Sequence, residues 1–151
     1  SKIIKRASYL RQLHDKSFPD VANFFLCWSI IQMEMKNFKE AGKASLNAAW
    51  ICDDSYEYKK KSIECRKKAI SFFKKAKSLN QTLCDTEFED SLLLIDLMRR
   101  CAMFNDASTL INEEYKRSHN EKEEITLQFQ EKLIENCDIK KHTISEVFSN
   151  F

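Results

Sequence analysis

Apolar side chains recur along this chain at intervals that predict helices. Residues 21–35 carry large apolar side chains on almost every side of a helix, as expected for a helix surrounded by neighbours. Residues 37–53 instead present one face of mostly small side chains, which consists of Phe38, Ala41, Ser45, Ala48 and Cys52. Because small side chains allow close packing, the two segments are predicted to form an antiparallel hairpin.

Amphipathic patterns continue through the rest of the chain. They predict helices over residues 2–13, 56–79, 86–100, 103–117 and 121–136, and a short helix with a tail over 138–151. Residues 53–55 (Asp-Asp-Ser) offer N-cap side chains to the longest helix, and Thr86 and Glu89 have the spacing of a capping box. The predicted core comprises Phe24, Phe25, Trp28, Ile31, Trp50, Phe73, Leu94 and Phe129. Replacing Trp28 with Ala is therefore expected to cost about 3–5 kcal/mol.

The composition supports an all-α fold. The chain contains one Gly and one Pro in 151 residues, whereas the turns of sheet proteins depend on both residue types. At this length one domain can bury a sizeable core, so we expect a single helical domain over residues 1–151. Within it, residues 1–14 would form a leading helix and residues 121–151 the C-terminal helices.

Charge is distributed unevenly, although the net charge is only +2. Residues 59–77 contain nine Lys or Arg and a single acid, Glu64, while residues 78–138 are net acidic. On a helix the lysines form two adjacent rows: Lys60, Lys67 and Lys74, and Lys61, Lys68 and Lys75. These rows could dock an anion such as nucleic acid, but no aromatic residue interleaves with them for base stacking. A solvated helix face is the interpretation we favour.

The cysteines and the hydropathy pattern indicate a cytoplasmic protein. Six widely spaced cysteines include no Cys-x-x-Cys pair, so we expect reduced, mostly buried thiols. No apolar run approaches the ~20 residues of a membrane span, and no signal peptide is visible at the start of the sequence.

Two corners of the chain have similar sequences. Residues 37–41 and 103–107 each join a very apolar helix to one that begins Phe-x-x-Ala. In a third segment Ala69, Phe73 and Ala76 share one helix face. The pattern resembles the tetratricopeptide repeat (TPR), whose second helix carries Ala, a large residue and Ala at these offsets. The matching positions are Ala41, Ala69 and Ala107, then Phe73 and Ile111, then Ala48 and Ala76.

The resemblance covers residues 20–118 and implies a right-handed superhelix of about six to eight helices that binds a protein or peptide. The chain departs from the repeat where Ser45 replaces an aromatic residue, where no Pro closes a repeat, and where the Gly of the first helix is missing. Residues 46–107 are also similar to the TPR-like C-terminal part of an uncharacterised bacterial family with an N-terminal zinc ribbon. No cysteine pair here could build that ribbon.

A TPR-like stack lines its groove with first helices, and the resemblance places partner-binding residues there. These residues are Asn23, Cys27, Met33, Glu34, Glu89, Asp96, Arg99 and Arg100. Asp96 lies three and four residues before the two arginines, so the three could grip a peptide backbone or a terminal carboxylate. A local ion pair at the helix end is the alternative, and the sequence leaves both open.

Catalytic and metal-binding signatures are weak. Asp138, His142 and Glu146 recur every four residues and could form a metal-binding column, but polar surface helices often show this spacing by chance. No Gly-flanked nucleophile or phosphate-binding loop occurs. We therefore expect no catalytic residue, no metal and no cofactor, and a role in protein interaction rather than catalysis. The oligomeric state stays open, with a homodimer among the possibilities.

Overall fold

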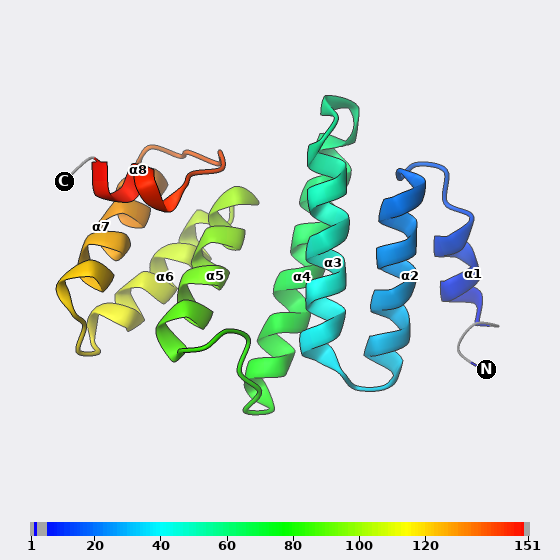
Figure 1. Ribbon diagram of the computed structural model, residues 1–151, viewed down its shortest axis with the longest axis horizontal. Coiled ribbons are helices and arrows are strands. Elements are labelled where there is room, and N and C mark those ends of the chain that lie inside the picture. The colour runs from blue at the N-terminus through cyan, green and yellow to red at the C-terminus, as the bar shows by residue number, and fades with distance from the viewer. Residues whose placement is uncertain (1, 3–5, 150–151) are drawn as a thin grey trace. The chain divides into compact units, whose positions relative to one another are not determined.

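The computed structural model describes residue 2 and residues 6–149, and every regular element within them is helical (Figure 1). This confirms the all-α prediction, with eight α-helices and one 3₁₀ helix in the described residues. The chain divides into two compact units, Ser1–Leu83 (unit 1) and Cys84–Phe151 (unit 2), which are described separately. The single domain and the TPR-like superhelix remain predictions.

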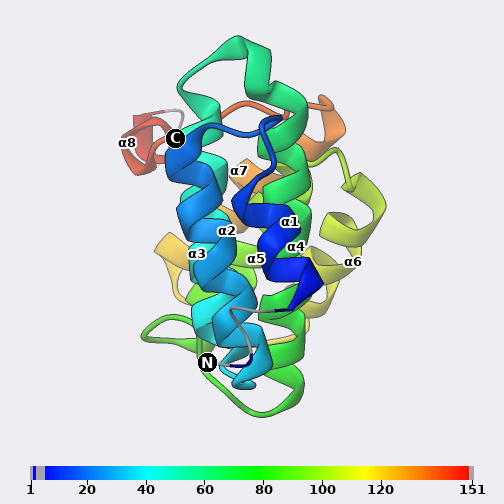
Figure 2. The same cartoon turned by 90° about the vertical axis from the view of Figure 1, so that its right-hand side faces the viewer.

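Unit 1 consists of consecutive helices that run up and down in turn (Figures 1 and 2). They are α1 (Ala7–Leu13), α2 (Asp20–Glu34), α3 (Phe38–Asp53), the 3₁₀ helix η1 (Tyr56–Tyr58) and α4 (Lys59–Ser78). The most extensive contacts join α3 to α2 and to α4, and α1 packs against α2. The expected hairpin of residues 20–53 is therefore present. The expected leading helix begins at Ala7, and residues 3–5 lie outside the described residues.

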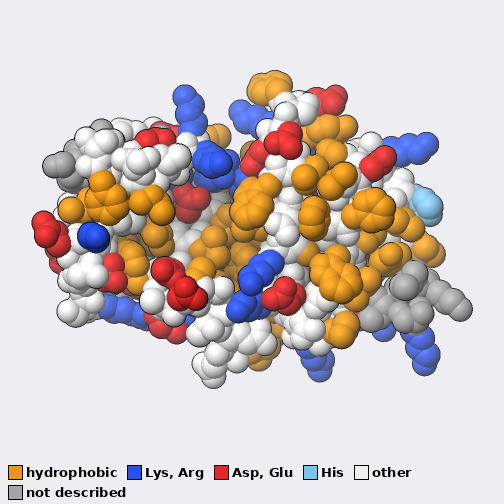
Figure 3. Space-filling view, viewed as in Figure 1, with side chains coloured by type: hydrophobic (Ala, Val, Ile, Leu, Met, Phe, Trp, Pro, Cys, Tyr) orange, Lys and Arg blue, Asp and Glu red, His pale blue; other side chains and the backbone are white. Residues whose placement is uncertain are grey.

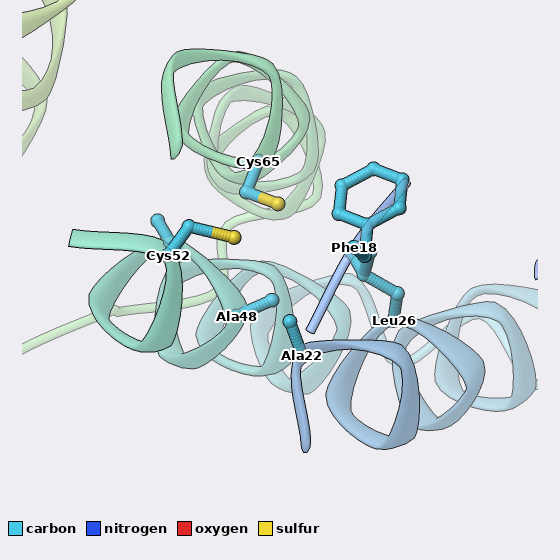
Figure 4. Close-up of a cluster of buried hydrophobic side chains, with 7 residues drawn as sticks. Phe18, Ala22, Leu26, Ala48, Cys52 and Cys65 are labelled. Carbon is cyan, nitrogen blue, oxygen red and sulfur yellow. The ribbon is translucent and has the colours of Figure 1, made fainter. Parts of the chain in front are cut away.

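Small side chains make the close packing of unit 1 possible. Ala41, Ala48 and Cys52 of α3 are completely buried, as is Cys65 of α4. Figure 4 shows Ala48 and Cys52 in a cluster that also receives Phe18 from the connection before α2. Bulkier side chains at the α3 positions would hold the three helices apart, so the small face predicted from sequence has the packing role expected of it.

The predicted core is wrong at three aromatic positions. Phe24 is 70% exposed, Trp28 50% and Trp50 53%. Phe25 and Ile31 are half-buried, whereas the predictions for Phe73, Leu94 and Phe129 are confirmed by their burial. The pattern of residues 21–35 suggested a helix covered on all sides, but the described neighbours cover only part of its circumference.

Unit 2 contains α5 (Glu87–Arg100), α6 (Phe104–Tyr115), α7 (Glu121–Glu135) and α8 (Ile144–Ser149). Helix α5 packs against α6 and α7, and α8 packs against α7. Thr86 caps α5 as expected, since its Oγ1 accepts the backbone N–H of Glu89 at 3.1 Å. The Glu89 carboxylate, however, accepts the backbone N–H of Asp85 instead of closing the box on Thr86. A complete capping box forms at Asn120, which the sequence analysis did not identify.

Non-glycine residues in the left-handed conformation end four of the helices. Lys36, Asn80, Ala102 and Cys137 have φ between 51° and 60°. In each case the next residue donates its N–H to a carbonyl five residues back, as Asn37 does to Gln32 at 2.8 Å. This Schellman geometry satisfies carbonyls at the helix end that would otherwise lack a donor. The chain therefore makes tight helix corners without the glycines that usually occupy these positions.

The N-cap expected for the longest helix is not formed. Residues 53–55 precede η1, and the Ser55 side chain makes no capping hydrogen bond. Asp53 instead binds Ser62 and forms an ion pair with Arg66, whose side chain is only 3% exposed. These contacts connect the C-terminal end of α3 to the first turns of α4.

Candidate functional site

Several exposed large apolar side chains of unit 1 form a continuous line along α2 and its C-terminal cap. We call Val21, Phe24, Trp28, Ile31 and Met35 the α2 ridge. Four of the five are exposed, by fractions from 50% at Trp28 to 70% at Phe24, and Ile31 is half-buried. At 100° per residue the five positions fall within a sector of about 80°. Hydrophobic side chains gather over α2 and α3 on the face of unit 1 shown in Figure 3.

Helix α1 covers one flank of the ridge. The Asn23 amide donates to the backbone carbonyl of Asp15 at 2.6 Å, and its oxygen accepts from Gln12 at 2.8 Å. Glu34 forms an ion pair with Arg6, just before α1. The flank of α2 beside the ridge is therefore occupied by the chain itself.

Helix α3 covers the opposite flank. The buried Ser29 hydroxyl donates to the backbone carbonyl of Ala41 at 2.8 Å and lies 2.9 Å from the hydroxyl of Ser45. Gln32 accepts a hydrogen bond from Asn37 at 3.0 Å. Small polar groups and Leu26 of α2 thus meet the small face of α3, whereas the side chains of the α2 ridge lie on another face.

A depression lies where the ridge meets α1. A pocket of about 220 Å³ is lined by Leu13, Asp20, Asn23 and Phe24. Leu13 is itself more than one-third exposed, so apolar surface extends from the ridge onto α1. A projecting row of side chains beside a shallow pocket is a surface that another helix can pack against.

The predicted partner-binding residues of α2 lie on other faces. Asn23 is buried and hydrogen-bonded to Gln12 of α1 and to Asp15 just after it, Met33 is half-buried, and Glu34 is half-buried and ion-paired. Cys27 is buried as well. Asn23, Cys27 and Glu34 thus face α1 and its N-terminal cap, whereas the exposed face carries Phe24 and Trp28, which were predicted to be core.

The predicted residues of α5 form an internal network. Arg99 is completely buried, and its Nη2 donates to Asp96 Oδ1 at 2.8 Å. Its Nε donates to Gln130 at 3.0 Å, and its Nη1 donates to the carbonyls of Asp138 and Lys140 at 2.6 and 2.9 Å. Arg99 therefore joins α5, α7 and the connection before α8, and it is not accessible to a partner. Arg100 is half-buried.

The two lysine rows differ in their surroundings. Lys61 and Lys68 lie over the Phe18 ring at 4.6 and 5.8 Å, and both form ion pairs with Glu64. Lys75 lies over the Phe38 ring at 5.8 Å. All three lysines of the second row therefore interact with other side chains of unit 1. In the first row Lys60, Lys67 and Lys74 are all exposed on α4.

Asp138, His142 and Glu146 do come together, but as a hydrogen-bonded group. The two ring nitrogens of His142 lie 2.6 Å from Glu146 Oε2 and 2.9 Å from Asp138 Oδ2. Partial burial lowers the pKa of His142, but the bonds to Glu146 and Asp138 outweigh it, so that the net shift is upward. Both nitrogens are thus engaged, and no group of ligands arranged for a metal ion occurs among the described residues.

All six cysteines are free thiols, and four of them are buried, which agrees with the expected reduced and mostly buried state. Burial raises the pKa of Cys65 to about 12. A thiol with so high a pKa is a poor nucleophile at neutral pH.

Comparison with known protein families, with curated proteins and with solved structures finds no match for this chain. None of the helices formed by the described residues combines the length and the apolar character needed to cross a membrane. The candidate site is therefore defined by its own geometry, as an exposed apolar ridge on an all-helical unit.

The signal for this ridge was present in the sequence. Val21, Phe24, Trp28, Ile31 and Met35 are spaced by three or four residues, like the a and d positions of a coiled coil. Phe24, Trp28 and Ile31 of this stripe were predicted to be core, because core and docking faces have the same spacing.

Proposed function

We propose that this protein is a protein-interaction module whose α2 ridge packs against an amphipathic helix of a partner. The observation that carries the proposal is the exposure of large apolar side chains in one line. Contiguous apolar surface of this kind on a folded unit is a usual mark of a binding site. Alternating spacings of three and four residues suit the side-chain interdigitation of two helices.

The charge of unit 1 supports a partner with acidic residues beside its apolar stripe. Residues 1–83 contain 17 Lys or Arg and 8 Asp or Glu, a net charge of +9. Exposed basic residues close to the ridge in sequence include Lys36 and Lys43. Complementary charge mainly raises the association rate and aligns the partner, while the apolar ridge would supply most of the affinity.

The TPR-like superhelix belongs to this proposal. Its support is the complete burial of matching alanines, with Ala41 and Ala48 in α3 and Ala69 and Ala76 in α4. The docking face proposed here is nevertheless the ridge and not the groove residues that the resemblance assigned.

A photo-crosslinking experiment tests the proposal. Benzoylphenylalanine replaces Trp28 in the ridge or, as a matched control, exposed Lys74 on α4. Irradiation in native extract should link position 28 to a segment with an amphipathic, acidic helical pattern, and Phe24→Ser should abolish that product. Identical products from positions 28 and 74, or none at position 28, would refute the proposal. A crosslink to a second copy of this chain would identify a homodimer as the assembly.

Anion binding through Lys60, Lys67 and Lys74 is the second candidate. Its support is the exposure of all three on one face of α4. The Phe18 ring beside Lys61 and Lys68 is buried and cannot stack on a base, whereas Tyr56, just before α4, is 86% exposed. Titration with single-stranded DNA at two salt concentrations separates the candidates. No binding at low salt removes this one, whereas binding that weakens with salt and with Lys67→Ala would favour it.

A further inference from the structure

Unit 2 contains a pocket that no part of the preceding proposal uses. It has a volume of about 300 Å³, which lies at the lower end of the range for small-molecule sites. Its apolar walls come from α5, α7 and α8, and they consist of Leu92, Leu93, Phe129, Ile144 and Val147. Three helices that are separate in sequence thus form one concave apolar surface.

Polar groups are concentrated at a few points of this pocket. Glu89, Asp96, Gln130 and His142 are among the lining residues, and the described residues that line it include no Lys or Arg. The Gln130 amide is held in place, because it accepts from Arg99 and donates to Asp96 at 3.2 Å. Hydrogen bonds therefore fix the position of the Gln130 side chain in the pocket wall.

Asp96 has one oxygen engaged and one available. Its Oδ1 accepts from both Arg99 and Gln130, and no described residue donates to its Oδ2. The Asp96 side chain is 36% exposed and lines the pocket. Since Arg99 and Gln130 fix the carboxylate through its other oxygen, Oδ2 is a preorganised acceptor for a donor that enters the pocket.

Charge favours a cationic donor. Residues 84–151 contain 15 Asp or Glu and 8 Lys or Arg, a net charge of −7, and the lining residues include the carboxylates of Glu89 and Asp96. An anionic ligand would be disfavoured by Glu89 and by the net negative charge of unit 2, although Arg99 compensates part of the charge of Asp96. A neutral apolar ligand would leave Asp96 Oδ2 without a partner as it displaced water.

The geometry points to a binding site for a small organic amine, with the apolar body against Leu93 and Phe129 and the ammonium group on Asp96 Oδ2. This inference goes beyond the proposed function and does not depend on it, because every residue it uses lies in unit 2. The apolar walls would supply most of the binding energy, and the carboxylate would select the cation.

Matched probes test the inference on the full chain. Phenylethylamine, phenylethanol and phenylpropionate share an aromatic body and differ in charge, and each is titrated while backbone amide NMR signals are recorded. Phenylethylamine should bind saturably, with shifts concentrated at the pocket residues. Asp96→Asn, which keeps an acceptor for Arg99 but removes the charge, should weaken binding about tenfold. Glu135→Gln, an exposed acid of α7 outside the pocket, should bind like the wild type.

A second variant keeps the test decisive if Asp96→Asn does not fold. Ile144 is 78% exposed at the pocket wall, so Ile144→Ser should fold normally and bind phenylethylamine several-fold more weakly. Absence of binding, equal binding of phenylethanol or phenylpropionate, or shifts centred outside the pocket would each overturn the inference. Equal affinity of folded Asp96→Asn and wild type would do so as well.

Discussion

Replacing the chain's single glycine tests the packing of α3 against α4 most directly. Gly42 lies inside α3, and a Cβ atom built on it would lie 2.5 Å from both Cδ1 and Cε1 of Phe73. Carbon atoms in contact are normally about 3.5–4.0 Å apart, so Gly42→Ala requires a movement of about 1 Å. The Phe73 side chain is 1% exposed, so its ring would have to shift among buried neighbours.

Two effects of Gly42→Ala oppose each other. Alanine stabilises a helix interior by about 1 kcal/mol relative to glycine. Overpacking of a filled core costs about 1–3 kcal/mol. Because the clash involves a buried ring rather than the end of a flexible side chain, we expect the second effect to exceed the first. The free energy of unfolding should therefore fall by up to about 2 kcal/mol.

Urea unfolding followed by tryptophan fluorescence measures this change. The chain contains two tryptophans, Trp28 and Trp50, and both belong to unit 1, so the signal reports the unit that contains the substitution. Lys43→Ala, at the adjacent exposed position, is the matched control and should change stability by less than about 0.5 kcal/mol.

A double-mutant cycle identifies the cause. Phe73→Leu shortens the side chain that meets the new methyl group, so Gly42→Ala should be less destabilising in that background than in the wild type. If Gly42→Ala instead stabilises the protein by the full propensity gain, the close approach of α3 and α4 is incorrect.

The remaining predictions concern stability and use far-UV circular dichroism with urea or heat. Arg99→Leu should destabilise by about 3–5 kcal/mol, because it removes a buried charge that binds two carbonyls and a carboxylate; a loss below about 1 kcal/mol would contradict the network. Trp28→Ala should cost less than about 1 kcal/mol, since half of the side chain is exposed, and a cost near 4 kcal/mol would restore the core assignment. Ala102→Gly should stabilise by about 0.5–1 kcal/mol, because φ is 57° there, and no gain would show that the αL conformation is not strained. The pKa of His142 is raised in the folded state. Protonated His142 therefore stabilises the fold fully below the unfolded pKa of 6.5, and this contribution is lost as the pH rises through the folded pKa. His142→Gln should remove that part of the pH dependence of stability.

Local sequence chemistry was enough to predict the secondary structure. The helices, the hairpin of residues 20–53 and the Thr86 cap depend on side chains a few residues apart, and such patterns are readable without knowing the fold. The capping box at Asn120 was readable too, because Glu123 follows three residues later. At Asp53 the local rule failed, since a buried Arg66 thirteen residues away attracts its carboxylate.

The candidate site could be predicted only in part. The composition of the α2 stripe was visible, but its exposure was not, and Asn23 was assigned to a groove that α1 fills. The spacing of three residues placed Asp96 within reach of Arg99 and left open whether the two form a local ion pair, which is present. Their further partners, Gln130 and the Asp138 carbonyl, are more than thirty residues away and could not be inferred from a local pattern.

The spacing of apolar residues is enough to show that this chain is helical, where its helices lie and that α3 has a face small enough for close packing. Tertiary structure alone decided which apolar stripe is covered and which is open. The physical reason is that helical periodicity is set by the backbone, whereas burial depends on whether another segment occupies the facing space. Phe24 and Phe73 look alike in sequence, yet one faces solvent and the other fills the gap above Gly42.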